Sequence, residues 1–174
     1  DTIAEIPADL AIVAGGSVGV LAENGVDATA KATGTSLKTG STNIGAAVAL
    51  NYVNVLDRGR IGDRVSITAG GDVTVTAVTP SGTRNDFTAW GMAAAGGTGQ
   101  ASVAGSIAVQ VLLLRNEATV GQGVRIVTDG GLTLAASNPM GLQSIAAAGA
   151  LSTSGAGIGA AIVVDYVDSD THAR

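Results

Sequence analysis

Three observations predict an all-β fold, a repetitive β-solenoid of the parallel β-helix-like kind. One alternating block occurs three times, as Leu10–Ala22, Val65–Ala77 and Val124–Ala136, with offsets of 55 residues (10 to 65) and 59 residues (65 to 124). Such repetition is typical of solenoids and arrays. Hydrophobic residues make up 46% of the 174 residues but aromatic residues only 2%, so the core is expected to be thin. Val and Thr alternate along the blocks, which favours strands.

The repeats divide the chain into three expected units. Unit 1 covers residues 1–64 with a partial N-terminal lead-in, unit 2 covers 65–123, and a truncated unit 3 covers 124–174. Repeats of this kind build length and surface rather than one singular pocket. The alternative to a solenoid is a layered antiparallel β stack, in which the strands around Gly96 and Gly97 close as hairpins.

Each unit is expected to begin with two short strands joined by a corner. In unit 2 these are Val65–Ala69 and Val73–Ala77, which both alternate at period two. Between them, Gly70–Gly71 is expected to form a tight turn, because glycine adopts positive φ freely. The residues expected on the inner face are Val65, Ile67, Ala69, Val73, Val75 and Ala77.

A loop of variable length follows the second strand. It covers residues 23–27, 79–86 and 137–141 in the three units. The four-residue difference between the two offsets falls in this loop, since the flanking blocks align without gaps. We therefore expect it to project from the stack, where insertions are tolerated, and to leave Arg84 free of the core. Replacing Arg84 by Ala is expected to cost less than about 0.5 kcal/mol.

A stretch of small residues comes after the loop, at positions 28–40, 87–99 and 142–154. Ala favours a helix, but each interspersed Gly costs up to about 1 kcal/mol there. Unit 1 is rich in Thr at the same positions, which indicates a strand. Because equivalent positions in stacked units should share one structure, we expect strands in all three.

The last strand of each unit is its most apolar one. We expect Val48, Ile107 and Ile162 to form one interior column, so that truncating Ile107 to Ala costs about 2–5 kcal/mol. A polar column lies beside it, where side chains of stacked strands hydrogen-bond one another or solvent: Asn51, Gln110 and Asp165.

Charge and composition exclude several classes of partner. The net charge of -5 argues against binding nucleic acid or an anionic membrane surface. The absence of Cys excludes disulfides and thiolate metal sites. No signal-peptide pattern opens the chain, and no apolar run reaches about 18 residues, so we expect neither a signal peptide nor membrane insertion.

Several segments carry a family resemblance. They are Gly-Gly-Asp-Val-Thr-Val-Thr-Ala (70–77), the Ala/Gly-rich middle, Val-Ala-Gly-Ser-Ile-Ala-Val-Gln-Val (103–111) and Ala-Thr-Val-Gly (118–121). The chain resembles, over essentially all of its 174 residues, the long repeats of giant bacterial surface adhesins of the leukotoxin type and related filamentous-haemagglutinin-like proteins. The resemblance implies an exported, elongated stalk on the bacterial cell surface, and it carries no catalytic residues to transfer.

Metal-binding patterns are weak in this sequence. The only histidine, His172, follows Asp165, Asp168 and Asp170, but the spacing fits neither an EF-hand loop nor a zinc pair. A solvated strand end is the favoured interpretation. Asp72 after two glycines is a lone fragment of the calcium-binding nonapeptide, which would have to recur in tandem. We therefore expect no metal site and no cofactor.

One charged cluster could serve a carbohydrate-active enzyme. A polysaccharide lyase of the β-helix type would need carboxylates and basic groups on one face. The candidate residues lie where units 1 and 2 join: Asp57, Arg58, Arg60, Asp63 and Arg64. Incidental ion pairs at the junction are the favoured interpretation, since surface ion pairs are common and contribute little. We expect no catalytic site and no enzymatic activity, and a carbohydrate-active β-helix enzyme stays an alternative.

Threonine and tryptophan offer two further binding hypotheses. Thr74 and Thr76 would suit an ice- or surface-binding plane, but such a plane needs threonine in every unit, and Gly19 and Leu21 take their places in unit 1. Trp90 corresponds to residues of quite different chemistry in the other units, which favours a lone buried or edge tryptophan over a sugar-stacking platform.

The favoured function is therefore structural. We expect a stalk segment of an exported filamentous surface protein that extends or presents adhesive regions. Its expected partners are neighbouring repeats or copies of the same protein joined end to end, with a host or matrix surface as a further candidate. The expected location is extracellular, at the bacterial cell surface. Solenoid ends expose unpaired strand edges, which is why end-to-end association is expected.

Overall fold

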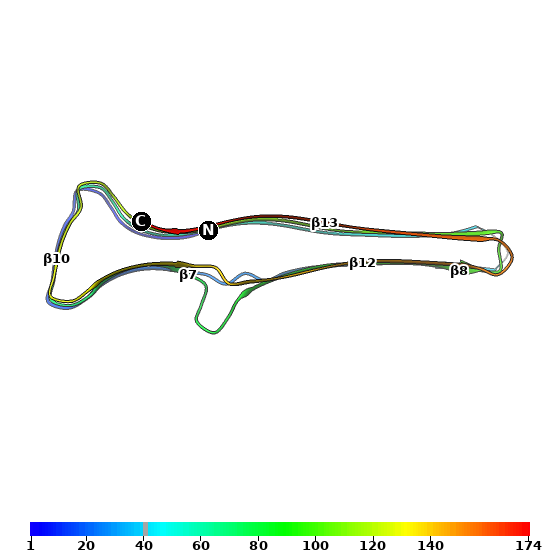
Figure 1. The fold of residues 1–174 in the computed structure, drawn as a ribbon, viewed down its shortest axis with the longest axis horizontal. Coiled ribbons are helices and arrows are strands. Elements are labelled where there is room, and N and C mark those ends of the chain that lie inside the picture. The colour runs from blue at the N-terminus through cyan, green and yellow to red at the C-terminus, as the bar shows by residue number, and fades with distance from the viewer. Residues whose placement is uncertain (40–41) are drawn as a thin grey trace.

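The computed structural model describes residues 1–39 and 42–174, and in this part of the chain it has thirteen strands and no helix (Figure 1). The strands form four sheets. Sheet A contains β1 (Thr2–Ile6), β5 (Asn43–Ile61), β9 (Ala101–Val120) and β13 (Ala156–Ala173). Sheet B contains β2 (Ala11–Ala14), β6 (Ser66–Ala69) and β10 (Arg125–Thr128). Sheet C contains β3 (Val18–Glu23), β7 (Val73–Val78) and β11 (Leu132–Ser137). Sheet D contains β4 (Ala28–Leu37), β8 (Asn85–Gly97) and β12 (Met140–Ser152).

The chain passes through sheets B, C, D and A in this order three times. We call each passage a coil: coil 1 is β2 to β5, coil 2 is β6 to β9, and coil 3 is β10 to β13. Every strand pairing in the described ranges is parallel. The prediction of an all-β fold is thus confirmed, and its antiparallel alternative is wrong. The strands on either side of Gly96 and Gly97 belong to different sheets instead of closing a hairpin.

The length difference between coils lies where the sequence predicted it. Val18 pairs with Val73, 55 positions along the chain, whereas Ala28 pairs with Phe87, 59 positions along. The extra four residues lie between β7 and β8, and the green loop in Figure 1 projects there from the otherwise superposed coils. The stretch after this loop forms β4, β8 and β12, as expected, but these strands end at Leu37, Gly97 and Ser152. Residues 38–39, 98–99 and 153–154 are therefore not strand, and residue 40 lies outside the described residues.

A core of branched side chains fills the wide end of the molecule, between sheets A, B and C (Figure 1). The six residues predicted on the inner face of β6 and β7 and just before them are all buried, with exposed fractions of 3% or less. All of them except Ala77 pack with Val20, Ile61 and Ala118 in one cluster, so that side chains of neighbouring coils touch. A smaller cluster around Phe87, Leu112 and Leu114 continues the core along sheets A and D.

The narrow end of the molecule has a different core. Here sheets A and D face each other across Ala47, Ala93, Ala95 and Ala104. The sheets approach so closely that a Cβ on Gly91 would lie 2.9 Å from the Ile107 carbonyl oxygen of the opposite sheet. Only small inner residues fit between backbones at this separation.

The predicted column of Val48, Ile107 and Ile162 exists, but it is not interior. The three residues pair in register, and their exposed fractions are 64%, 37% and 54%. The inner face of the same strands carries the alternate positions, among them Ala49 and Ala108. The prediction chose the wrong face of these strands. It assigned the larger apolar side chains to the core, whereas the narrow space between the sheets admits only small ones.

The corners of the coils also differ from expectation. Gly70 and Gly71 do not adopt positive φ; a Cβ on Gly70 would instead lie 2.6 Å from the Gly15 carbonyl oxygen of coil 1. Positive φ occurs at the preceding corner, at Asp9 (63°), Arg64 (55°) and Gly123 (68°). Only the last of these is a glycine, so coils 1 and 2 hold a non-glycine residue in the left-handed region, which costs about 1–2 kcal/mol.

Candidate functional surfaces

The polar column predicted from the sequence lies inside the molecule. Asn51 and Gln110 are buried, and the Asn51 amide donates to the Gln110 side-chain oxygen over 3.3 Å. The Gln110 amide in turn donates to the Gln143 carbonyl (2.8 Å) and to the Ser144 hydroxyl (2.7 Å). The Ser144 hydroxyl donates to Asp165. This ladder satisfies buried polar groups from coil to coil, as an interior must.

Asp57 forms a second buried polar site. Its carboxylate accepts hydrogen bonds from the Asn24 and Asn116 amides, each over 3.2 Å. Burial raises the pKa of Asp57, and the two hydrogen bonds partly oppose this by favouring the charged form. The carboxylate therefore links two coils through amides and faces the interior rather than the solvent.

The remaining members of the predicted charged cluster lie elsewhere. Arg58 points outward and pairs with Glu117 of coil 2 at 2.7 Å. Arg60 pairs with Glu5 at 3.8 Å and with Asp63 at 3.9 Å. The structure thus separates Asp57, on the inside, from the basic side chains on the outside, and the five residues do not converge in one groove.

Arg64, the fifth residue of that cluster, lies at the exposed corner next to coil 1. Its guanidinium donates two hydrogen bonds to Asp9, of 2.6 and 2.7 Å. The pair lowers the pKa of Asp9 and raises the pKa of Arg64, in both cases mainly through the hydrogen bond. The contacts of Arg58 and Arg64 both connect coil 1 to coil 2, so their chemistry is that of ion pairs between neighbouring coils.

The aspartates before His172 do not all lie on the same face of β13. Asp165 belongs to the inner ladder, while the His172 ring nitrogen Nδ1 lies 3.3 Å from the Asp170 carboxylate on the outer face. Within residues 1–39 and 42–174, no three His, Cys, Asp or Glu side chains gather closely enough to hold a metal ion.

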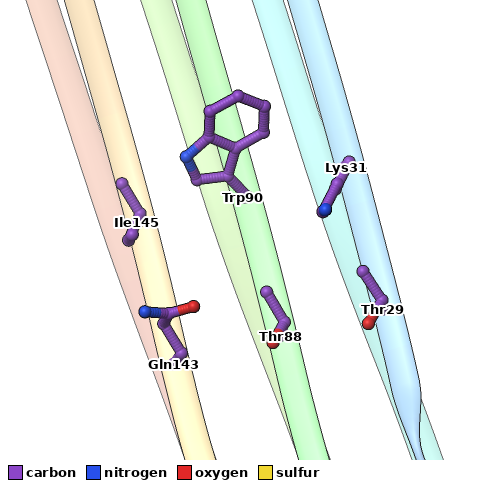
Figure 2. Close-up of a pocket in the computed structure, with 6 residues that line it drawn as sticks. All are labelled: Thr29, Lys31, Thr88, Trp90, Gln143 and Ile145. Carbon is purple, nitrogen blue, oxygen red and sulfur yellow. The ribbon is translucent and has the colours of Figure 1, made fainter.

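A shallow groove of about 270 Å³ marks the outer face of sheet D (Figure 2). Trp90 lies at its centre, between Lys31 of coil 1 and Ile145 of coil 3, and a second row contains Thr29, Thr88 and Gln143. Trp90 faces outward from the central strand β8 and is partly buried, not fully buried or on an edge strand. The first row places three unlike side chains side by side, and the second repeats Thr in two coils only, so the groove is unique rather than repeated.

The threonine plane does not form on sheet C. Gly19 and Thr133 lie in register with Thr74, and Leu21 and Ala135 lie in register with Thr76.

Sequence reasoning missed the most apolar surface, because it placed these residues inside. On the outer face of sheet A, apolar side chains occupy four positions in each of the three coils, and we call this set the apolar face. Its members are Ile44, Val48, Leu50, Tyr52, Val103, Ile107, Val109, Val111, Ile158, Ile162, Val164 and Tyr166. The signal that could have revealed it is the run of Ala, Ser and Gly at the alternate positions of β5 and β9.

The fold and these surfaces define an all-β protein of parallel strands repeated in register. Comparison with family models, with curated proteins and with solved structures finds no match to this chain. Over the described residues there is also no helix with the length and hydrophobicity needed to cross a membrane. Function must therefore be argued from the geometry itself.

Proposed function

We propose that the coils form a β-solenoid and that this segment serves as a structural stalk of an exported filamentous bacterial surface protein. The observation that carries the proposal is the unbroken register: each long strand of sheet A pairs residue by residue with the next, from β5 through β9 to β13. A stack of this kind grows by adding identical layers, which builds length rather than a single site.

Hydrogen bonds between neighbouring coils support the proposed role as a mechanical stalk. The inner ladder joins Asn51 to Gln110, and Asp57 joins Asn24 to Asn116. At the corners, side chains of one coil accept hydrogen bonds from backbone N–H groups of the next: Gln122 N–H donates to Asp63, and Gly131 N–H donates to Asp72, over 2.9 and 2.8 Å. These hydrogen bonds between neighbouring coils hold one coil on the next.

The same geometry supports end-to-end association as part of the proposal. In the described residues, β13 pairs on one side only, and Asp165 stands in the column that Asn51 and Gln110 occupy in the earlier coils. If coil 1 of a second copy stacked on coil 3, the Asn51 amide would come next to the Asp165 carboxylate. An amide donor beside a carboxylate acceptor continues the ladder across the junction.

Electron microscopy and sedimentation test this proposal together. We expect rods that lengthen with protein concentration at constant coil cross-section, with strands spaced about 4.7–4.9 Å along the rod. Asp165→Lys should shorten the rods, because a long cation replaces the acceptor in the ladder. The matched control is Asp129→Lys, an exposed aspartate of the same coil that lies outside the ladder. Particles that stay one copy long at high concentration would contradict end-to-end association.

Presentation at the cell surface, with adhesive regions held outward, completes the proposal. Antibodies against this segment should label intact cells of the source bacterium, and removal of the segment should bring the rest of the protein closer to the cell envelope. Labelling only after the cells are broken would contradict the surface location.

A further inference from the structure

The apolar face is too large to be an ordinary exposed surface. In β9, which is paired on both sides, Val103 and Ile107 still have exposed fractions of 38% and 37%, so the exposure belongs to the face itself and not to an open end of the stack. A coil with neighbours on both sides thus exposes on the order of 200 Å² of apolar surface on this face, and the surface is continuous from coil to coil, whereas monomers rarely expose contiguous apolar patches of more than a few hundred Å². An apolar surface of this extent indicates that something covers it.

We propose that the apolar face packs against the apolar face of a second copy of this chain, so that two stacks lie side by side. The area of the face grows with the number of coils, and about four coils reach the roughly 800 Å² that a standard interface buries on each partner. The shape also matches, because the face is a three-stranded part of a sheet, and sheets pack face to face with their side chains interdigitated. A second copy supplies the same surface with the same strand spacing.

Charges beside the apolar face set the relative direction of the two copies. Where the strands continue past it, β5 carries two arginines on the outer side, β13 carries two aspartates, and β9 carries one charge of each sign. These residues are Arg58, Arg60, Asp168, Asp170, Arg115 and Glu117. If the coils of the two copies run in opposite order, β5 of each copy lies across from β13 of the other. Asp168 and Asp170 then lie across from Arg58 and Arg60, and this orientation is favoured even though the two arginines also pair with Glu117, Glu5 and Asp63 of their own chain.

Lateral pairing is independent of end-to-end stacking. It uses the outer face of sheet A, whereas stacking uses the edge of β13, the part of β5 that β1 does not pair with, and the edges of the other sheets. A failure of one contact therefore leaves the other measurable: stacking changes the length of a particle, and lateral pairing changes its width.

Cross-linking tests the pairing directly. The chain has no cysteine, so a single introduced thiol reports one position. Ile107→Cys places it at the centre of the apolar face in coil 2, away from both ends of the stack. We expect a short bis-maleimide to convert this variant to covalent dimers. Thr68→Cys is the matched control, because it is an exposed position in the same coil on the outer face of sheet B, and it should stay monomeric on a denaturing gel.

A charge introduced into the face tests the energetics. Val48→Glu puts a carboxylate into the proposed contact and should weaken lateral association at least about tenfold in sedimentation equilibrium. Val13→Glu is the control, since Val13 is 85% exposed on sheet B and should leave association unchanged. Both substitutions are on the surface, and circular dichroism should show the same β content as in the unchanged chain.

Three outcomes would overturn the proposal. Equal cross-linking of the two cysteine variants would mean that contacts are random, and single-width particles for the unchanged chain would mean that the face stays uncovered. If the unchanged chain remains single-width but binds phosphatidylcholine vesicles, and Val48→Glu alone abolishes that binding, the occupant is a lipid surface rather than a second copy.

Discussion

The wide end of the molecule, around β10, encloses Val and Ile side chains between three sheets, whereas at the narrow end two sheets meet across Ala and Gly (Figure 1). Both ends belong to the same three coils and share the same parallel register. What differs is the volume of the inner residues, and the spacing of the sheets follows that volume because protein interiors are close-packed. In a long strand such as β9, every second residue faces inward. The size of these inner residues therefore sets how closely the opposite sheet packs at each point along the strand.

The largest expected effect comes from the wide end. Ile67 is fully buried in the Val and Ile core, so Ile67→Ala should lower the free energy of unfolding by about 2–5 kcal/mol. Ile107→Ala, at the narrow end and on the outer face, should cost less than about 1 kcal/mol when copies are kept apart by dilution. Urea unfolding of both variants measures the difference. A similar loss for the two would mean that Ile107 is a core residue after all.

Overfilling the narrow end should have the next largest effect. Gly91→Val would press a branched side chain against the Ile107 carbonyl and should destabilise by about 1–3 kcal/mol. Gly105→Val is the control, because a Cβ at Gly105 would meet no atom within 4 Å and Val favours a strand. Thermal unfolding should therefore separate the two variants. An unchanged melting temperature for Gly91→Val would show that the sheets can move apart.

Asp57 belongs to neither the wide-end cluster nor the narrow-end cluster, and it should make the free energy of unfolding depend on pH. Burial raises the pKa of Asp57 above its ordinary value of 3.8, so the folded state binds this proton more tightly than the unfolded state. Stability from this group is then greatest below pH 3.8 and falls as the pH rises through the raised pKa.

Asp57→Asn should remove this loss of stability with rising pH, because Asn does not titrate. The difference in urea midpoint between the variant and the unchanged chain should therefore shift in favour of the variant as the pH is raised from below 3.8. Taking the difference cancels the contributions of the other carboxylates. A difference that stays constant with pH would contradict a raised pKa for Asp57.

The smallest effect is expected in the projecting loop, which belongs to neither core. The Arg84 side chain is 64% exposed and pairs with Asp86, itself exposed, at 2.7 Å. Arg84→Ala should change the free energy of unfolding by less than about 0.5 kcal/mol. If the loop carries adhesion, the same variant should bind less to a host or matrix surface at an unchanged melting temperature. A large loss of stability would mean that the loop is packed.

The sequence predicted the wide end well and the narrow end poorly, for a physical reason. At Val65, Ile67 and Val73, apolar side chains alternate with polar ones, so the inner face is evident. Along β5 both sets of positions are apolar or small, and residue size points to the wrong face. The decisive fact is the distance to the opposite sheet, and no pattern within β5 alone contains it.

The polar interior could be predicted only in part. The alignment of Asn51, Gln110 and Asp165 followed from the repeat, and the structure confirms the register. Its burial did not follow, because polar residues are normally expected outside. They are tolerated inside since each amide finds a partner on the neighbouring coil. Side chains alternate between the two faces of β5, and this alternation places Asp57 inside and Arg58 and Arg60 outside. Asp63 and Arg64 lie beyond the end of the strand.

The thin pair of sheets at the narrow end has a mechanical consequence. For a beam, resistance to bending grows with the cube of its thickness in the direction of bending. A rod stacked from coils with the cross-section in Figure 1 would therefore behave as a ribbon: it flexes readily perpendicular to its flat faces and resists bending edgewise. Two ribbons joined through their flat faces would double that thickness and be much stiffer in the direction in which each one alone is soft.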